Sequence, residues 1–492
     1  MKKLTLFFLV LCAFFSCTKK EDQFNLMEGL LIKNARIIST EDLSISEKST
    51  IVIEKNSIIY IGNNAPEISG TYQNIDAEGQ YVIPGLIDSH VHVTGTDGLS
   101  EEEEIANPSI VKNYRTQLPK SYLYFGYTTL IDLGTTKPKR LSDFNNATVK
   151  PDLFYVGGGA VIGNGYGLSN WKDSIPNFIY QEDENYPIPE KYLKENHTPE
   201  AVAKRVAASG AIAIKTYYEP GFDPSQPPMP TPSKELMEQI KTEAHRNDLV
   251  LVVHGNSTKA HRFLADAQVD IVAHGLWNWG DESLGEDNQI PMGVAKALDM
   301  EVENNIMYMP TLQVINGLNS LTTPEFLNDA ELKNVLPESL IDYYKAHTES
   351  KYLEVFGDAP RDMIQRSFNR ISAQGKAALN YLYQKNAKIL FGTDTPASPT
   401  FGNPPGYNGY LEMTEMVNAG IPLGTIYQSA TIKNARAFKL DSLYGGIEVG
   451  KRANILVLNQ NPLEDISAYN DISIVIIQGK ALDRESLSAL RN

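Results

Sequence analysis

Between residues 85 and 435, short apolar segments alternate with stretches of helical periodicity, and this alternation constrains the fold more than any other feature. Eight segments are expected to be strands, at 86–93, 128–133, 153–157, 211–217, 249–254, 271–274, 306–312 and 389–394. Residues 233–246 form the clearest intervening helix, with Thr231, Pro232 and Ser233 as its start signal. Strands that alternate with helices favour βα units and a parallel sheet. Eight such units predict an α/β fold with a (β/α)8 TIM barrel at 85–435.

Both ends of the chain lack helical periodicity and are predicted to be β structure. Four short apolar segments bounded by turn residues lie in 29–84, and two more lie in 436–492. The economical arrangement is one small β-sandwich domain, with 29–84 as its first part and 436–492 as its second part.

Five of the eight predicted strands carry polar residues that the apolar pattern does not explain. These residues are His90, His92, Lys215, His254, His274 and Asp394. His90 and His92 point to the same face, because side chains two apart in a strand share a face. An isolated pair of this kind is open to a second interpretation, as two core histidines with satisfied hydrogen bonds. Agreement among five strands argues against it, since barrel enzymes build their sites at strand C-termini.

Several motifs together resemble the amidohydrolase superfamily, in the branch similar to imidazolonepropionases and metal-dependent prolidases. They are Pro-Gly-Leu-Ile-Asp-Ser-His-Val-His at 84–92, Lys215, His254, His274, Gly-Thr-Asp at 392–394, the segment 126–132 and the closing segment 446–463. Their order and spacing match the family over about residues 29 to 482. One departure is Tyr127, where the family usually has valine.

The resemblance implies a centre of two divalent metal ions, most often zinc. His90, His92 and Asp394 would hold the more buried ion, and His254 and His274 would hold the other. Lys215 would bridge both ions as an N-carboxylated lysine, whose carbamate derives from carbon dioxide. Burial favours this chemistry, because it lowers the pKa of a lysine toward the free amine that reacts. Asp394 would also be the catalytic general base and then acid in hydrolysis by a metal-activated hydroxide.

Three tyrosines are the candidate substrate-binding residues. Tyr217 alternates with Lys215 and is therefore expected on the same face of the strand. Tyr166 lies in a glycine-rich loop, where relatives often have a histidine, and Tyr308 lies in the seventh predicted strand. No arginine that could clamp a substrate carboxylate is evident in these loops. The nearest candidates belong to an inserted segment and are Arg361, Arg366 and Arg370.

Two long insertions follow predicted strands, at 157–192 and at 317–388, and the second is expected to be mostly helical. Both leave strand C-termini and are therefore candidate lids over a site. The alternative is that they thicken the outer shell or form a contact between subunits, so a homo-oligomer stays open.

The net charge of −16 over 492 residues argues against a nucleic-acid partner, whose phosphates need a basic surface. No glycine-rich nucleotide-binding loop occurs between a strand and a helix. No nucleotide cofactor is therefore implied, and the resemblance implies a small molecule or dipeptide as the substrate.

The N-terminus is predicted to be a lipoprotein-type signal peptide at 1–17, followed by a polar tether at 18–28. Lys2 and Lys3 precede an apolar run at 4–15 that is too short to span a bilayer. Cys17 follows a small residue as in a bacterial lipobox, and would be the lipid anchor. We expect an exported outer-membrane lipoprotein of a Gram-negative bacterium, facing the periplasm or the surface. An ordinary secretory signal is the alternative.

These observations favour a hydrolase that cleaves an amide-type C–N bond in a small substrate. A dipeptide, including Xaa-Pro, or a cyclic amide is the leading class. One alternative is hydrolysis of a lactone or phosphoester by the same centre. Another is a non-catalytic lipoprotein that binds a ligand, for which a lost metal ligand is expected, and none is lost here.

Overall fold

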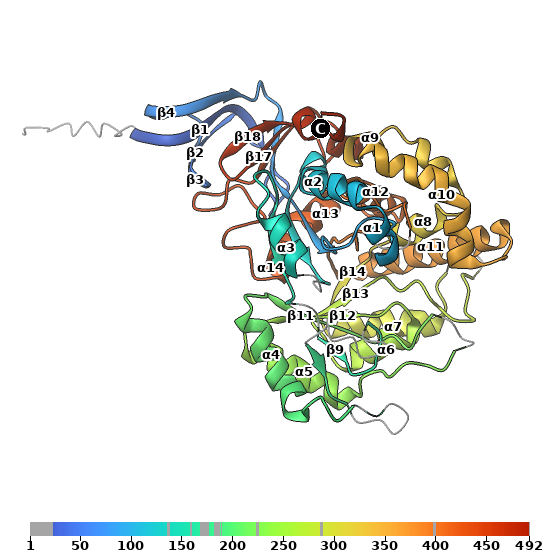
Figure 1. Ribbon diagram of the computed structural model, residues 1–492. Coiled ribbons are helices and arrows are strands. Elements are labelled where there is room, and N and C mark those ends of the chain that lie inside the picture. The colour runs from blue at the N-terminus through green and yellow to red at the C-terminus, as the bar shows by residue number, and fades with distance from the viewer. Residues whose placement is uncertain are drawn as a thin grey trace, which may run out of the picture.

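The structure is a computed structural model that describes residues 23–134, 138–157, 160–167, 177–181, 187, 189–222, 226–285, 289–396 and 400–491. It is a mixed α/β molecule, with strands from both chain ends at the upper left of Figure 1 and most helices to the right and below. The predicted signal peptide and Cys17 lie outside the described residues. Within the described part of the chain, no helix is both long and apolar enough to cross a membrane.

Eight parallel strands run through the centre of the molecule, in two sheets. One sheet contains β6 (Leu86–Val91), β7 (Tyr127–Asp132) and β8 (Asp152–Tyr155). The other contains β11 (Ala213–Tyr217), β12 (Val250–His254), β13 (Ile271–Ala273), β14 (Met307–Met309) and β15 (Lys388–Ile389). Each of the eight predicted segments overlaps one of these strands.

The last parallel strand is shorter than predicted, because β15 ends at Ile389 rather than at residue 394. The following residues still bond to the first strand: Ser89 N–H donates to Phe391 O (3.3 Å), and Asp394 N–H donates to His90 O (2.7 Å). On the opposite side, Ile212 N–H donates to Tyr155 O (3.1 Å). Both edges of the three-stranded sheet are therefore hydrogen-bonded to segments next to the five-stranded sheet.

Helices surround these strands. They are α1 (Glu101–Ala106), α2 (Pro108–Tyr124), α3 (Pro138–Asn145), α4 (Pro199–Ala208), α5 (Lys234–Arg246), α6 (Thr258–Asp266), α7 (Met292–Glu303), α8 (Gln313–Asn319), α9 (Leu332–Val335), α10 (Glu338–Phe356), α11 (Arg361–Gln384), α12 (Tyr407–Asn418), α13 (Leu423–Gln428) and α14 (Asn434–Ala437). The Ser233 side chain caps α5 by accepting from Leu236 N–H, as the start signal predicted. The insertion at 317–388 is mostly helical, as expected, and supplies α9, α10 and α11.

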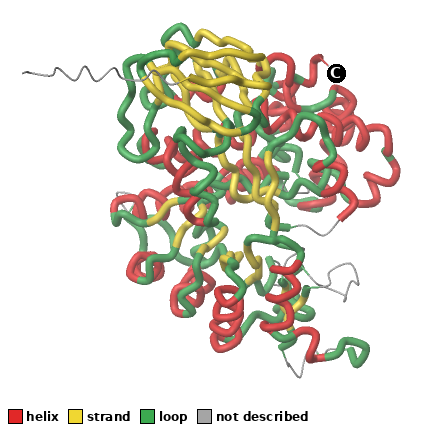
Figure 2. The backbone as a smooth tube through the Cα atoms, turned by 90° about the vertical axis from the view of Figure 1, so that its left-hand side faces the viewer, coloured by secondary structure: helices red, strands yellow, loops and turns green. Residues whose placement is uncertain are grey.

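Strands from both chain ends share one further sheet. From the N-terminal part come β1 (Gln23–Ile37), β2 (Ser49–Glu54), β3 (Ser57–Gly62), β4 (Glu67–Asp76) and β5 (Tyr81–Pro84), and from the C-terminal part come β16 (Ile455–Leu458), β17 (Ile472–Ile477) and β18 (Lys480–Asp483). The order is β18-β17-β16-β5-β1-β2-β3, with β4 paired to β1. Figure 2 shows this sheet as a yellow layer at one end of the molecule. A parallel two-stranded sheet of β9 (Val161–Ile162) and β10 (Phe178–Ile179) lies in the first insertion.

The predicted tether at 18–28 needs a correction for its second half. Residues from Gln23 onward belong to β1 and pair with β4. Leu26 is buried beside Leu31 and Val52, so this segment carries an apolar contact that holds it in the sheet. The polar residues around it concealed this short apolar pattern.

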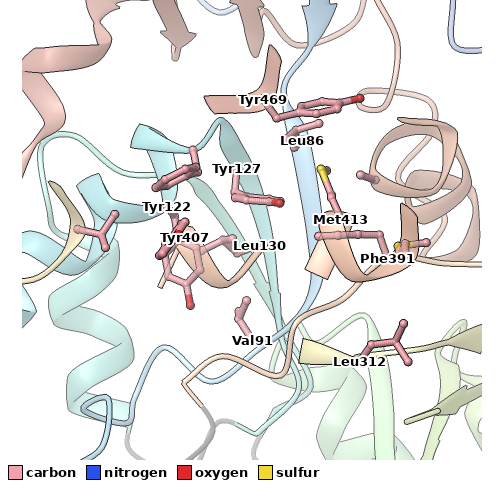
Figure 3. Close-up of a cluster of buried hydrophobic side chains, with 14 of the residues drawn as sticks. Leu86, Val91, Tyr122, Tyr127, Leu130, Leu312, Phe391, Tyr407, Met413 and Tyr469 are labelled. Carbon is pink, nitrogen blue, oxygen red and sulfur yellow. The ribbon is translucent and has the colours of Figure 1, made fainter. Parts of the chain in front are cut away.

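A large buried cluster packs between the parallel strands and the helices around α2 and α12, and Figure 3 shows part of it. The Tyr127 ring stacks on Phe391 with centroids 5.7 Å apart. A Cβ atom on Gly409 would lie 2.3 Å from the Tyr127 ring, so α12 accommodates this tyrosine only because residue 409 is glycine. The aromatic residue at position 127 is thus part of the core.

The buried Asn434 side chain joins the first and last parallel strands. Its amide donates to Ile87 O (2.9 Å) and Phe391 O (2.7 Å), and its carbonyl accepts from Phe391 N–H (3.1 Å). We predict that Asn434→Ala lowers the free energy of unfolding by about 3 kcal/mol or more, since it leaves buried backbone groups unpaired. Urea unfolding measures this change. Asn418→Ala, which removes an exposed amide of α12, should change it by less than about 0.5 kcal/mol, and equal losses in both variants would contradict the assignment.

Candidate metal centre

His90 and His92 meet Asp394 at the C-terminal end of β6. Asp394 Oδ1 lies 3.0 Å from His90 Nε2 and 2.7 Å from His92 Nε2. One ligand atom from each residue lies within 4.8 Å of the other two, a grouping that could hold a metal ion. The backbone of Asp394 has a φ of 58°, which turns the chain at the point where its side chain faces the two rings.

His274, His254 and Lys215 continue this group from the neighbouring strands. The His274 ring centroid lies 4.9 Å from that of His90 and 4.7 Å from that of His254. Lys215 is buried, and its Nζ lies 5.6 Å from the Tyr217 ring centroid. All six predicted ligands line one cavity of about 700 Å³, so the structure brings them together.

The protonation states of these groups suit a cation. Burial alone would raise the pKa of Asp394, but His90 and His274 beside it hold that pKa well below its usual range. Burial lowers the pKa of His90 to about 3 and also lowers the pKa values of His254 and His274. For His92, Asp394 outweighs burial and raises the pKa. Neutral imidazoles beside an anionic carboxylate are the donors that zinc-like ions take. At His92, whose pKa is raised, a bound ion would displace the ring proton.

Burial also lowers the pKa of Lys215 to about 8, against the opposing pull of the Asp394 carboxylate. An appreciable fraction of this amine is therefore uncharged near neutral pH, unlike an exposed lysine.

Three further residues hold the candidate ligands in place. Thr311 Oγ1 lies 3.0 Å from His274 Nδ1, and Glu219 Oε2 lies 3.3 Å from His254 Nε2. Buried Asp88 accepts from the backbone and the hydroxyl of Thr393, the residue before Asp394. Such partners fix the orientation of ligating side chains. Sequence reasoning missed Thr311 and Glu219; for Glu219, the continued alternation after Lys215 and Tyr217 was the available signal.

The predicted tyrosines divide into two groups. Tyr166 and Tyr217 line the cavity, and the Tyr166 ring stacks on His254 with centroids 5.3 Å apart. Tyr308 is a correction, because it is fully buried outside the described cavity lining and its hydroxyl accepts from Leu276 N–H (2.7 Å). Strand alternation at β14 directs this side chain into the helical layer.

The remaining histidines lie outside the cavity lining and have structural partners. His261 contacts Glu301 (2.6 Å), and His245 contacts Asp270 (2.9 Å). His197 and His347 each hydrogen-bond a backbone carbonyl through Nδ1. These contacts agree with a structural role for all four.

A parallel α/β sheet with a His-His-Asp group at its strand ends is typical of metal-dependent hydrolases. Residues 81–482 match the family model described as "Amidohydrolase family". The chain therefore belongs to the amidohydrolase family, and the predicted resemblance is confirmed.

Three curated relatives show the range of this family. The chain is 21% identical over 471 residues to the 5'-deoxyadenosine deaminase of Methanosphaera stadtmanae, covering 93% of this chain and 91% of that protein. It is 34% identical over 122 residues to the dihydroorotase of Carboxydothermus hydrogenoformans, covering 25% and 24%. It is 27% identical over 157 residues to the imidazolonepropionase of Bdellovibrio bacteriovorus, covering 30% and 35%. The matches to the last two span only a quarter to a third of those enzymes, and all three names are those of enzymes acting on C–N bonds.

Solved structures of similar fold include prolidase-like enzymes. A Xaa-Pro dipeptidase with bound methionine has a TM-score of 0.61 and 21% identity, with 92% of this chain and 100% of that chain covered. A putative prolidase from Bifidobacterium longum has a TM-score of 0.59 and 22% identity, with 93% and 95% covered. At these identities the likeness establishes the fold alone.

The buried amine of Lys215 makes a prediction about stability and pH. In the metal-free protein below pH 8, Lys215 is protonated although it is buried. This lowers the free energy of unfolding by about 3 kcal/mol, because the lysine of the unfolded chain titrates near the ordinary value of 10.5. This cost falls as the pH rises from 8 to 10.5, because the unfolded chain then releases its proton too. Chelator-treated Lys215→Met should therefore be more stable than wild type at pH 7, by a margin that falls to roughly a quarter at pH 10.

Urea unfolding of both proteins at pH 7 and pH 10 measures this margin. Lys388→Met, which removes an exposed lysine at the start of β15, is the matched control. A margin for Lys215→Met that stays constant with pH would contradict the prediction.

Proposed function

We propose that the chain is a metal-dependent hydrolase that cleaves an amide-type C–N bond in a small substrate. The observation that carries this proposal is the convergence of four imidazoles, one carboxylate and one buried amine on a single cavity of about 700 Å³. A cavity of this size suits a ligand such as a dipeptide or a cyclic amide. Membership of the amidohydrolase family supports the same reaction type.

His90, His92 and Asp394 would hold one divalent ion, and His254 and His274 a second, with zinc as the expected metal. Lys215 would bridge them after carboxylation by carbon dioxide, which bonds its nitrogen to the carbon of CO₂ and releases one proton. The lowered pKa of about 8 supports this step, because only the uncharged amine reacts. When bound, such ions generate a hydroxide at neutral pH and polarise the scissile carbonyl.

The chain's own residues would supply the proton transfer and the binding surface. Asp394 is anionic, and its Oδ2 lies 3.8 Å from His274 Nδ1, within the ligand group. From there it can accept a proton from the attacking water and deliver it to the leaving nitrogen. Tyr217 and Tyr166, whose ring centroids lie 5.5 Å apart, would flank the substrate. Trp277, beside His274 at 5.3 Å between centroids, would exclude water.

Dipeptides, including Xaa-Pro, are the substrate class that the neighbours favour. One neighbour is a Xaa-Pro dipeptidase with methionine bound in its active site, and another is a prolidase complexed with N-methylphosphonate-L-proline. Dihydroorotase and imidazolonepropionase among the relatives make cyclic amides the second class.

We further infer that the eight parallel strands close into a (β/α)8 TIM barrel at 85–435. The backbone hydrogen bonds that join both edges of the two sheets support this closure. The segments 29–84 and 436–492 would form one small β-sandwich. A shared apolar cluster supports it, with Ile32 and Ile53 from one segment and Ile455 and Ile476 from the other.

The metal centre predicts a clear pattern of metal content and activity. Zinc-loaded wild type should contain about two ions per chain and hydrolyse members of a dipeptide and cyclic-amide panel. Asp394→Asn and Lys215→Ala should reduce kcat by about 100-fold or more, because they remove a proton acceptor and a bridge. Elemental analysis and amine-release assays measure these effects.

His347→Gln is the matched control, because this histidine lies outside the cavity lining. Among the described residues, its ring hydrogen-bonds only Tyr343 O and stacks only on the Tyr343 ring. It should retain wild-type metal content and activity. Wild type that binds no zinc and hydrolyses no amide would refute the proposal. Hydrolysis restricted to lactones or phosphoesters would replace it with the alternative chemistry.

We also propose that the chain is exported and anchored in the outer membrane through lipidated Cys17. Cys17→Ala should move the protein from the membrane fraction to the soluble fraction, because a diacylglyceryl group is lost. Immunoblots of fractionated cells measure this shift. Cys12→Ala, within the same apolar run, should leave the protein in the membrane fraction, and an unchanged distribution for Cys17→Ala would favour the ordinary secretory signal.

A further inference from the structure

We infer that Arg370 binds a free carboxylate of the substrate, and that the adjoining wall of α8 and α11 packs against an apolar side chain next to it. This inference rests on the proposed function and narrows it. The substrate class is then a dipeptide or N-acyl amino acid whose apolar C-terminal residue carries the carboxylate.

The charges around the cavity single out Arg370. Apart from the histidines, the described lining residues with ionisable charge are Lys215, Asp394 and Arg370. The first two belong to the candidate metal centre. Arg370 is therefore the one guanidinium or ammonium group, among the described lining residues, that is left to meet a substrate anion.

The three arginines of α11 differ in their partners. Arg361 donates to Leu321 O (3.0 Å) and pairs with Glu349, and Arg366 pairs with Asp362 (2.6 Å). Within the described part of the chain, Arg370 has neither a hydrogen bond nor an ion pair, and its side chain is exposed to the cavity. A guanidinium without a protein carboxylate presents a planar fork of donors that matches a ligand carboxylate.

The wall beside Arg370 is apolar. Val314, Ile315 and Leu318 of α8 pack with Phe368 and Ile371 of α11 in one cluster that also contains Trp277. Trp277 is the member of this cluster that contacts His274, with ring centroids 5.3 Å apart. The cavity thus extends from the metal ligands along an apolar surface to a cation, and the helical insertion supplies Arg370 together with the part of that surface made by Leu318, Phe368 and Ile371.

This arrangement selects among the proposed substrates. A neutral cyclic amide has no carboxylate to pair with Arg370. An apolar C-terminal residue packs its side chain against the apolar wall and pairs its carboxylate with Arg370. A charged hydrogen-bonded pair partly open to solvent contributes enough to change affinity by about tenfold. The cavity therefore favours C-terminal acids over their amides.

The test compares Ala-Leu with Ala-Leu-amide as substrates of the zinc-loaded full chain. Wild type should show at least about a tenfold higher kcat/KM for the acid. Arg370→Met should remove this preference by raising KM for the acid. Its kcat for the acid, and both kcat and KM for the amide, should stay within about twofold of the wild-type values. Arg370→Lys should restore part of the preference. Arg366→Met, on the same helix but paired with Asp362, should behave as wild type.

A binding measurement separates this inference from the proposed function. Calorimetry with leucine and leucinol, which lacks the carboxylate, should show that wild type prefers leucine and that Arg370→Met does not. If wild type prefers leucine but hydrolyses no substrate, the carboxylate site at Arg370 is supported and the proposed hydrolase function is refuted. Hydrolysis with equal effects of Arg370→Met on acid and amide, or with no effect on either, would overturn the inference and retain the hydrolase.

Discussion

The backbone hydrogen bond from Asp394 N–H to His90 O joins the two ends of the parallel-strand region at the point where the candidate metal ligands meet. These residues lie about 300 positions apart in the chain, and the bond places their side chains in direct contact. Buried Asp88 and Asn434 hold the same junction, through Thr393 and through the backbone of Phe391. The geometry of the site therefore depends on how the first and last parallel strands are joined.

A group of buried ionisable side chains is costly unless something compensates it. Asp394 is partly compensated by the imidazoles around it, whereas Asp394 is the one carboxylate among the described residues that raises the pKa of Lys215. In the proposed metal centre, Lys215 would carry an anionic carbamate and serve as a metal ligand, so a destabilising residue would become a stabilising one. The same burial that disfavours the ammonium form creates the uncharged amine that this reaction needs.

Much of the site could be predicted from the sequence, because its residues follow apolar strands. A polar residue at the end of an apolar run is conspicuous, and parallel strands bring their ends together. Glu219 was missed because it lies in the loop after its predicted strand, where polar residues are ordinary, and Thr311 was missed because threonine is ordinary within a strand such as the predicted 306–312. Tyr308 was misplaced because a tyrosine in a short strand is equally compatible with either face. Its burial against Leu276 depends on packing that only the three-dimensional structure reveals.

The fold shows the same division. The eight parallel strands follow from alternating apolar and helical segments, whereas the start of β1 at Gln23 depends on pairing with β4, which no local pattern predicts. The packing of α11 against α8 likewise places Arg370, rather than Arg361 or Arg366, in the cavity lining.

The most direct test is anomalous diffraction at the zinc absorption edge from crystals of zinc-loaded protein. We expect two peaks in the cavity, one bounded by His90, His92 and Asp394 and one by His254 and His274, with added density on Lys215 Nζ. A cavity without anomalous peaks, in crystals whose zinc lies only on the outer surface, would contradict the proposed metal centre.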